Sequence, residues 1–131
     1  MSRPAANEGD TVMSRRKGPY ECGLDAAVDV IGGKWKVLLL WQLAQGPQRF
    51  GELKRALPDI SEKVLSQQLR EMETDRIVHR EVYHQVPLKV EYSLTELGTS
   101  LNAALEPLGV WGRAHMGEIE ATYEARHPRA S

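Results

Sequence analysis

Long apolar runs and cysteine are both scarce in this chain. The longest apolar run, from Val37 to Trp41, is far shorter than the ~20 residues that span a bilayer. No apolar signal segment follows the N-terminus, and such a segment is what directs a chain to secretion. Cys22 is the single cysteine, so any disulfide must join two chains or a small thiol. These absences predict a cytoplasmic protein with no membrane partner.

Signatures of catalysis and of metal binding are also missing. The sequence has no glycine-rich phosphate loop and no GxSxG segment. Its 4 histidines do not show the HxxxH or Cys/His spacing of metal ligands. They are His79, His84, His115 and His127. We therefore predict a protein that is not an enzyme and that needs no metal or organic cofactor.

Length and composition predict one soluble globular domain. The chain has 131 residues, of which 27% are charged and 41% hydrophobic. Residues 1–20 lack periodicity and are predicted to form a flexible arm, where Arg15 to Lys17 either contact phosphates or are simply solvated. The domain is expected over residues 21–123, followed by a flexible tail at 124–131.

The charge is unevenly distributed along the chain. The formal net charge is −1, with 17 basic and 18 acidic residues. From Lys34 to Val90 there are 10 basic and 7 acidic residues, whereas from Glu91 onward there are 3 and 6. A mildly basic middle fits a segment that contacts nucleic acid, although imbalances of this size also arise by chance.

Two apolar helices are expected before the middle of the chain. Residues 24–31 form the first, Gly32 and Gly33 interrupt it, and residues 34–45 form a strongly apolar second helix at the centre of the core. Trp35 and Trp41 are interpreted as core residues. The alternative, a ligand pocket that these tryptophans line with Leu40, fits the same spacing.

A helix-turn-helix is predicted next. Apolar residues recur at helical spacing over residues 49–57, and Pro58 and Asp59 then break the chain. Ser61 suits the N-cap of a second helix that runs to Thr74. The apolar face of this helix comprises Leu65, Leu69 and Met72, and its polar face comprises Lys63, Ser66, Gln67 and Arg70.

This polar face has the side-chain types that contact phosphates and base edges. Only Glu62 and Glu71 oppose its positive charge. An ordinary solvated helix would show a similar pattern, so the neighbouring segments decide the interpretation.

Two strands follow, at residues 78–85 and 89–94, with a turn between them. A hairpin directly after such a helix is typical of a DNA-binding wing, with His84 and Lys89 near its tip.

A C-terminal helix is expected from Thr95, which can cap it. Its apolar residues recur every three or four positions: Leu94, Leu97, Leu101, Leu105 and Leu108. Pro107 and Gly109 are expected to kink or divide the helix. The apolar surface, continued by Trp111, predicts a second subunit, and the alternative is a helix folded back onto its own core.

Several segments, taken in their order along the chain, together resemble the HxlR-type family of bacterial winged helix-turn-helix transcriptional regulators, which is related to the MarR group. They are Cys22, GGKW at 32–35, RFGELKRALPDIS at 49–61, VLSQQLREME at 64–73, VPLKVEYSLTELG at 86–98, and Trp111. The resemblance covers about Cys22 to Met116. One departure lies at Thr74 to Val78, where the family commonly has a glycine. Without glycine a left-handed C-cap costs about 1 kcal/mol, although Asp75 tolerates that conformation better than most residues.

The resemblance implies a mainly α fold with a small β-hairpin wing, that is, a winged helix-turn-helix domain with N- and C-terminal dimerisation helices. It implies a homodimer that binds double-stranded DNA at a palindromic operator, with the helix from Ser61 in the major groove. The predicted DNA-binding residues are Lys34, Arg49, Ser61, Lys63, Ser66, Gln67, Arg70, His84 and Lys89. The predicted dimer interface comprises Leu24, Leu101, Leu105, Leu108 and Trp111. Alanine in place of Gln67 is expected to relax preference at one base position.

Cys22 is the candidate for regulation, because some members of the family sense oxidants or electrophiles through a cysteine at this position. The alternative is that Cys22 is a small buried hydrophobic residue. Two other functions stay open at this point. The chain could respond to a small-molecule effector instead of thiol oxidation, or the winged helix could dock proteins in place of DNA.

Overall fold

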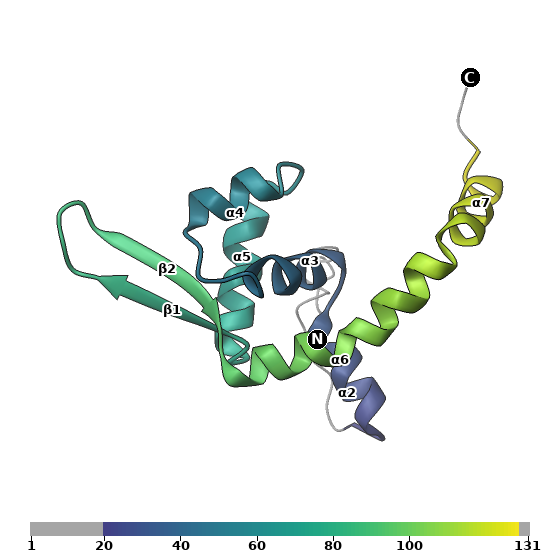
Figure 1. The fold of residues 1–131 in the computed structure, drawn as a ribbon, viewed down its shortest axis with the longest axis horizontal. Coiled ribbons are helices and arrows are strands. Elements are labelled where there is room, and N and C mark those ends of the chain that lie inside the picture. Colours follow the sequence, from purple (N-terminus) through teal and green to yellow (C-terminus); the bar gives the residue numbers. More distant parts are fainter. Residues whose placement is uncertain (1–19, 129–131) are drawn as a thin grey trace, which may run out of the picture. The chain divides into compact units, whose positions relative to one another are not determined.

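The computed structural model describes residues 20–128 of the chain. These residues form six helices and one two-stranded antiparallel sheet (Figure 1). The elements are α2 (Gly23–Ile31), α3 (Lys34–Leu43), α4 (Phe50–Ala56), α5 (Glu62–Thr74), β1 (Val78–Tyr83), β2 (Lys89–Leu94), α6 (Glu96–Ala114) and α7 (Met116–Arg126). The predicted mainly α fold with a β-hairpin is confirmed. The predicted arm, including Arg15 to Lys17, lies outside the described residues apart from Tyr20.

The chain divides into two compact units, the first ending at Thr99 and the second beginning at Ser100. The core of the first unit is built around α3, whose Leu39, Leu40 and Leu43 are buried. This helix contacts α4, α5 and β2. The prediction that it is the centre of the core is therefore confirmed.

The prediction that both tryptophans of α3 belong to the core is wrong for Trp41, whose side chain is 64% exposed. Trp35 is half-buried. Successive helical residues are about 100° apart, so Trp41 lies about 200° from Leu39 and Leu43 around the helix. The burial of these leucines turns Trp41 away from the core of its own chain.

The connection between α3 and α4 pairs with the wing. The helix ends at Leu43, two residues before the predicted end, and Gly46 has a φ of 136°. Gln48 then pairs with Tyr92 of β2 through two backbone hydrogen bonds of 2.9 and 2.8 Å. The side-chain nitrogen of Gln48 donates to the Gln42 carbonyl oxygen at 2.7 Å. One residue thus ties the end of α3 to the sheet.

Both ends of α5 are capped. The Ser61 hydroxyl accepts a hydrogen bond from the backbone N–H of Val64 at 3.1 Å, which confirms the predicted N-cap. At the other end, the N–H of Ile77 donates to the Met72 carbonyl at 2.9 Å and that of Arg76 to Glu73 at 3.0 Å. These two bonds form a Schellman motif. The residue in the left-handed conformation is Arg76, with φ 64°, and not Asp75, which tolerates that conformation better.

Replacing Arg76 by glycine is expected to stabilise the protein by roughly 0.5–1 kcal/mol. A side chain in the left-handed region brings Cβ close to the carbonyl oxygen, and glycine removes that cost at the expense of more unfolded-state freedom. Urea unfolding followed by circular dichroism would measure the change in midpoint. A lower midpoint for the glycine variant would mean that the Arg76 side chain contributes more than its backbone conformation costs.

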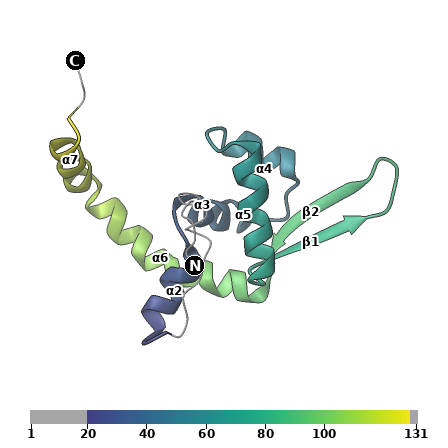
Figure 2. The same cartoon turned by 180° about the vertical axis from the view of Figure 1, so that it is seen from behind.

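The wing is a regular antiparallel hairpin, from the pair Val78–Leu94 to the pair Tyr83–Lys89. Its first strand ends at Tyr83, two residues earlier than predicted. Because side chains alternate across a strand, His79, Glu81 and Tyr83 share one face, and all three are exposed. Val78 on the other face is buried, and β1 contacts α5 (Figure 2).

A cluster of hydrogen bonds joins the end of the wing to α6. The backbone N–H of Thr95 donates to the Ile77 carbonyl at 3.0 Å, and its hydroxyl donates to the Arg76 carbonyl at 2.7 Å. The same hydroxyl accepts from the N–H of Gly98 at 3.0 Å, which confirms Thr95 as the cap of this helix. Thr95 therefore ties the C-terminal turn of α5 to the start of α6.

In the second unit, α6 continues without interruption to Ala114. Pro107 and Gly109 were expected to kink or divide this helix; a division is wrong, because Pro107 lies inside it, and a kink stays a prediction. The break comes instead at His115, before α7. The tail predicted from residue 124 begins inside α7, which ends at Arg126.

None of the helices within residues 20–128 combines the length and the apolar character that a membrane-spanning helix requires.

Candidate nucleic-acid interface

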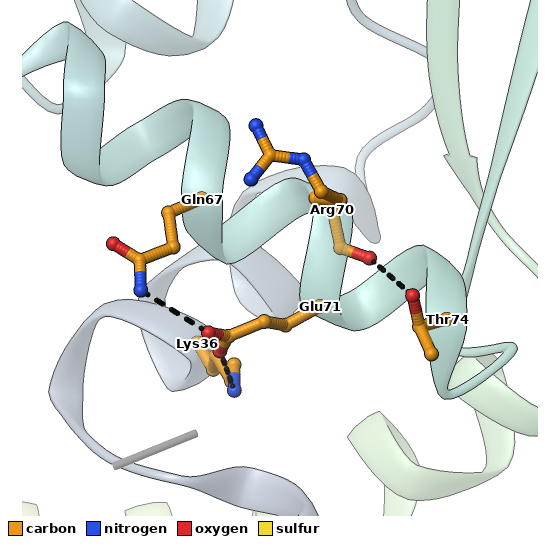
Figure 3. Close-up of polar contacts among 5 residues, drawn as sticks. All are labelled: Lys36, Gln67, Arg70, Glu71 and Thr74. Carbon is orange, nitrogen blue, oxygen red and sulfur yellow. Dashed lines mark hydrogen bonds and ion pairs between the residues drawn. The ribbon is translucent and has the colours of Figure 1, made fainter. Parts of the chain in front are cut away.

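The second helix of the helix-turn-helix, α5, has two distinct faces. Leu65, Leu69 and Met72 are buried against the rest of the first unit. Lys63, Ser66 and Arg70 are exposed. The guanidinium group of Arg70 lies on the side of the helix away from the core contacts of Glu71 (Figure 3). The predicted apolar and polar faces are confirmed for these residues.

Gln67 differs from the other predicted polar-face residues because it is half-buried. Its side-chain nitrogen lies 3.4 Å from Oε2 of Glu71. The other carboxylate oxygen of Glu71 accepts a hydrogen bond from Nζ of Lys36 at 2.6 Å (Figure 3). The sequence analysis counted Glu71 as a charge that opposes the positive face of α5. In the structure Lys36 neutralises this carboxylate, so it does not act as an unpaired charge.

Lys36 was missed by the sequence analysis, although it left a signal. It follows Lys34 as the second cation of the strongly apolar helix α3, and its side chain is only 5% exposed. Buried lysines almost always have a partner, so an acidic residue facing α3 could have been expected. The hydrophobic pattern alone does not identify which carboxylate that is.

The turn between α4 and α5 is fixed by both polar and apolar contacts. Nζ of Lys54 donates to the Pro58 carbonyl at 2.9 Å, and Ile60 is buried. At the start of α4, the N–H of Arg49 donates to Oε1 of Glu52 at 2.8 Å. This bond leaves the Arg49 side chain exposed at the N-terminus of the helix. The turn thus holds α4 and α5 in a helix-turn-helix.

The wing carries a lysine and two carboxylates that lie close together. Nζ of Lys89 lies 3.6 Å from Oε2 of Glu91 and 4.8 Å from the centre of the Tyr83 ring. Glu91 is directly opposite Glu81 in the hairpin, and Glu81 accepts from His79 at 2.7 Å. Partial desolvation, and then the charges of Glu91 and Glu81, raise the pKa of Tyr83. The predicted tip residue His84 is exposed in the loop.

The predicted DNA-binding residues fall on four parts of the first unit. Ser61, Lys63, Ser66, Gln67 and Arg70 lie at the start of α5 or along it, and His84 and Lys89 lie in the hairpin. Lys34 begins α3, with its ammonium 4.8 Å from the centre of the Trp35 ring, and Arg49 precedes α4. The structure thus places a mixed set of cations, two hydroxyls, an amide and an imidazole on a helix-turn-helix with a wing.

Cys22 is exposed at the N-terminus of α2. The alternative in which it is a buried hydrophobic residue is wrong for the chain as described. Asp25 accepts hydrogen bonds from the N–H groups of Glu21 at 2.9 Å and Cys22 at 3.1 Å. The bond from Glu21 is the main cause that lowers the pKa of Asp25, while partial desolvation raises it and the N–H and thiol of Cys22 lower it.

The lowered pKa of Asp25 predicts how the start of α2 responds to acid. Because the folded pKa lies below the ordinary value of 3.8, this carboxylate stabilises the cap above that pH and loses its effect as the pH falls through the folded pKa. In an acid titration followed by NMR, the amide signals of Glu21 and Cys22 should shift with a shared midpoint below 3.8. A midpoint at or above 3.8 would contradict this account of the cap.

Residues 20–128 contain no group of three or more histidine, cysteine or acidic side chains that could hold a metal ion. Several apolar side chains are exposed in each unit taken by itself. Leu24 of α2 is 72% exposed, and in the second unit Leu108 and Trp111 are 62% and 55% exposed. Leu101 and Leu105 are half-buried. These are the residues predicted to form a dimer interface, and that role stays a prediction.

Comparison with known proteins identifies the family. Residues 30–120 match the model of the HxlR-like helix-turn-helix family. The HTH-type transcriptional regulator YybR of Bacillus subtilis strain 168 is 46% identical over 113 residues, which cover 83% of this chain and 90% of that protein.

Two regulators whose structures have been solved have a similar fold. The redox regulator HypR in its reduced form is 47% identical, with a TM-score of 0.72 over 76% of this chain and 99% of that chain. The diamide-treated transcriptional regulator YodB of B. subtilis is 37% identical, with a TM-score of 0.64 over 72% of this chain and 94% of that one. This protein belongs to the HxlR-like helix-turn-helix family and is a transcriptional regulator of the helix-turn-helix type.

Proposed function

We propose that this regulator is a homodimer that binds a specific palindromic DNA operator through α5 and the wing. The observation that carries the proposal is the exposed Lys63, Ser66 and Arg70 on the side of α5 opposite its buried leucines. A helix held in this way can enter the major groove, where side chains of these types contact base edges and phosphates.

Different residues are assigned different tasks in the proposed complex. Arg70 suits a bidentate contact with guanine, and Ser66 and Gln67 offer shorter polar groups to neighbouring bases. Lys63 contacts a phosphate or a base, and Ser61 combines its capping role with a place at the N-terminus of the inserted helix. Four further residues position the duplex: Lys34, Arg49, His84 and Lys89. The ion pair of Lys36 with Glu71 reduces the repulsion that phosphates would meet beside α5.

The sharpest test of this assignment compares Arg70→Ala with Arg126→Ala. Both variants remove one positive charge per chain, but Arg126 is exposed in the last turn of α7, outside the helix-turn-helix. On an operator selected from randomised duplexes, Arg70→Ala should weaken binding about tenfold or more and relax preference at one base position. Arg126→Ala should bind as the wild type does. Equal losses in both variants would contradict a base-reading role for Arg70.

Lys89→Ala is expected to weaken binding by a similar factor on every DNA sequence. A phosphate contact carries no sequence information, and losing it lowers the slope of log affinity against log salt by about one. The Glu91 carboxylate, 3.6 Å from Nζ of Lys89, already offsets part of the lysine charge. The slope should therefore change by no more than about one. Titrations at several salt concentrations measure the slope, and an unchanged slope would remove Lys89 from the phosphate contacts.

We further propose that oxidation of Cys22 controls DNA binding. Two observations support this: the thiol is exposed at the N-terminus of α2, and similar solved structures include a redox regulator in reduced and oxidised forms. In the proposed reaction, two Cys22 thiols from two chains lose two electrons and two protons to an oxidant such as diamide. The products are an interchain disulfide and the corresponding hydrazine.

The redox proposal is tested with diamide on the wild type and on a Cys22→Ser variant. DNA affinity should change on oxidation in the wild type only and return after treatment with dithiothreitol. An effect of equal size in both proteins would assign the response to another group. No effect in either protein would favour control by a small-molecule effector in place of thiol oxidation.

A further inference from the structure

We infer that Lys36 and Glu71 are positioning residues that fix the orientation of the Gln67 amide for base readout. This inference rests on the proposed binding of DNA by α5. The ion pair joins α3 to α5, and it lies next to a side chain on the proposed reading helix (Figure 3). Neither Lys36 nor Glu71 is itself assigned a contact with DNA.

The contacts of Glu71 favour one orientation of the Gln67 amide. Lys36 donates to Oε1 of Glu71 at 2.6 Å, and Oε2 of the same carboxylate faces the amide nitrogen of Gln67 at 3.4 Å. An ionised carboxylate only accepts hydrogen bonds, so it favours the nitrogen end of the Gln67 amide over the oxygen end. Figure 3 shows the amide oxygen of Gln67 pointing away from the ion pair.

This orientation has a consequence for base recognition. A free glutamine amide can rotate to offer either its oxygen or its nitrogen, which lowers its ability to discriminate between bases. With its nitrogen held towards Glu71, Gln67 presents an oxygen acceptor, which matches the amino groups of adenine and cytosine in the major groove. One N–H of the amide stays available to donate, so a two-bond contact with adenine is also compatible. We therefore expect adenine or cytosine at the position that Gln67 reads.

The packing around Lys36 keeps the ammonium group in place. The side chains of Lys36 and Glu71 are 5% and 20% exposed, so water competes little for this pair. A Cβ atom at Gly32 would lie 3.1 Å from Nζ and 3.2 Å from Cδ of Lys36. The lysine thus packs tightly over the turn between α2 and α3, and Gly32, with φ 69°, leaves room for it.

A stabilising role alone does not account well for this pair. Taking two charges out of water costs several kcal/mol, and apolar side chains of similar volume often give equal or greater stability. The pair does orient the Gln67 amide, because it determines which end of that amide is available to contact a base. The double variant Lys36→Met/Glu71→Gln removes both charges together and leaves no unpaired buried ion. The amide that replaces the Glu71 carboxylate can accept or donate, so it no longer orients Gln67.

The experiment measures base preference position by position. Four proteins are compared: wild type, Gln67→Ala, Glu71→Gln and Lys36→Met/Glu71→Gln. Each is used to select from randomised duplexes and is then titrated with single-base variants of the wild-type operator. We expect Gln67→Ala to lose a preference of about tenfold for adenine or cytosine at one position. The double variant should lose most of the same preference while retaining those at other positions. Circular dichroism and thermal unfolding establish that each variant is folded.

The outcomes separate the inference from the proposed function. Parallel weakening at all positions in the Glu71 variants would overturn a positioning role and indicate a structural one. A full preference at the Gln67 position in those variants would overturn it too, as would a wild-type preference for guanine or thymine there. A wild type that binds every duplex equally would overturn sequence-specific binding itself, and the inference with it.

Discussion

Replacing Gly98 by alanine should lower the free energy of unfolding by about 3 kcal/mol, the upper part of the range for overpacking a core. The new Cβ atom would overlap the Ile77 carbonyl oxygen and lie 3.2 Å from Cγ2 of the same residue. That oxygen cannot easily move, because it accepts a hydrogen bond from the backbone N–H of Thr95 at 3.0 Å. The substitution therefore forces apart the C-terminal turn of α5, where Ile77 lies, and the start of α6.

Gly51→Ala is the matched control for Gly98→Ala. Gly51 lies within α4, where a Cβ atom would meet only the guanidinium end of Arg55 at 3.7 Å. Glycine inside a helix costs stability relative to alanine, so this variant should be equally stable or up to about 1 kcal/mol more stable. Thermal and urea unfolding measure both variants. If Gly98→Ala were as stable as the control, the close packing of α6 against Ile77 would be refuted.

Leu108→Glu is expected to convert the proposed dimer into a monomer and to reduce operator affinity by a hundredfold or more. Leu108 is 62% exposed in the single chain, so the charge should be tolerated by the fold of the chain itself. In a dimer the same position would be buried, and burying an unpaired carboxylate is strongly unfavourable. A monomer contacts one half-site only, which removes the gain from joining two reading helices. Light scattering gives the mass, and titration with the operator gives the affinity.

Ala103→Glu places the same charge on another side of α6. Five residues separate positions 103 and 108, so the two side chains lie roughly 140° apart around the helix. Ala103 is exposed, and the variant should stay dimeric and bind DNA. If the Leu108→Glu protein were a dimer with normal affinity, the apolar face of α6 would not be the interface.

The sequence predicted those parts of the site that depend on local patterns. The two faces of α5 follow from helical periodicity, and its start follows from the preference of serine for the N-cap. The capped start of α6 at Thr95 has the same origin. The hairpin was recognised because β-branched and aromatic residues surround a proline-containing turn, although β1 ends two residues earlier than expected. Each of these features is decided by residues close together in the chain.

The features that the sequence did not predict depend on residues distant in the chain. The ion pair of Lys36 and Glu71 joins two helices. Gln48 pairs with Tyr92 as an isolated residue, so no alternation of apolar and polar residues marks it as part of a strand. Arg76 takes the left-handed position because the Schellman bonds fix it there, even though Asp75 tolerates that conformation better. Trp41 was assigned to the core by its hydrophobicity, but its place around α3 exposes it.

The central claim is that α5 and the wing read a specific DNA sequence, and the most direct test is equilibrium binding of the wild-type chain to two duplexes. One is an operator selected from randomised DNA, and the other has the same composition in scrambled order. We predict that affinity for both falls linearly with salt on logarithmic axes, and that the operator is bound about a thousandfold more tightly or better. Equal affinity for the two duplexes at every salt concentration would contradict the claim.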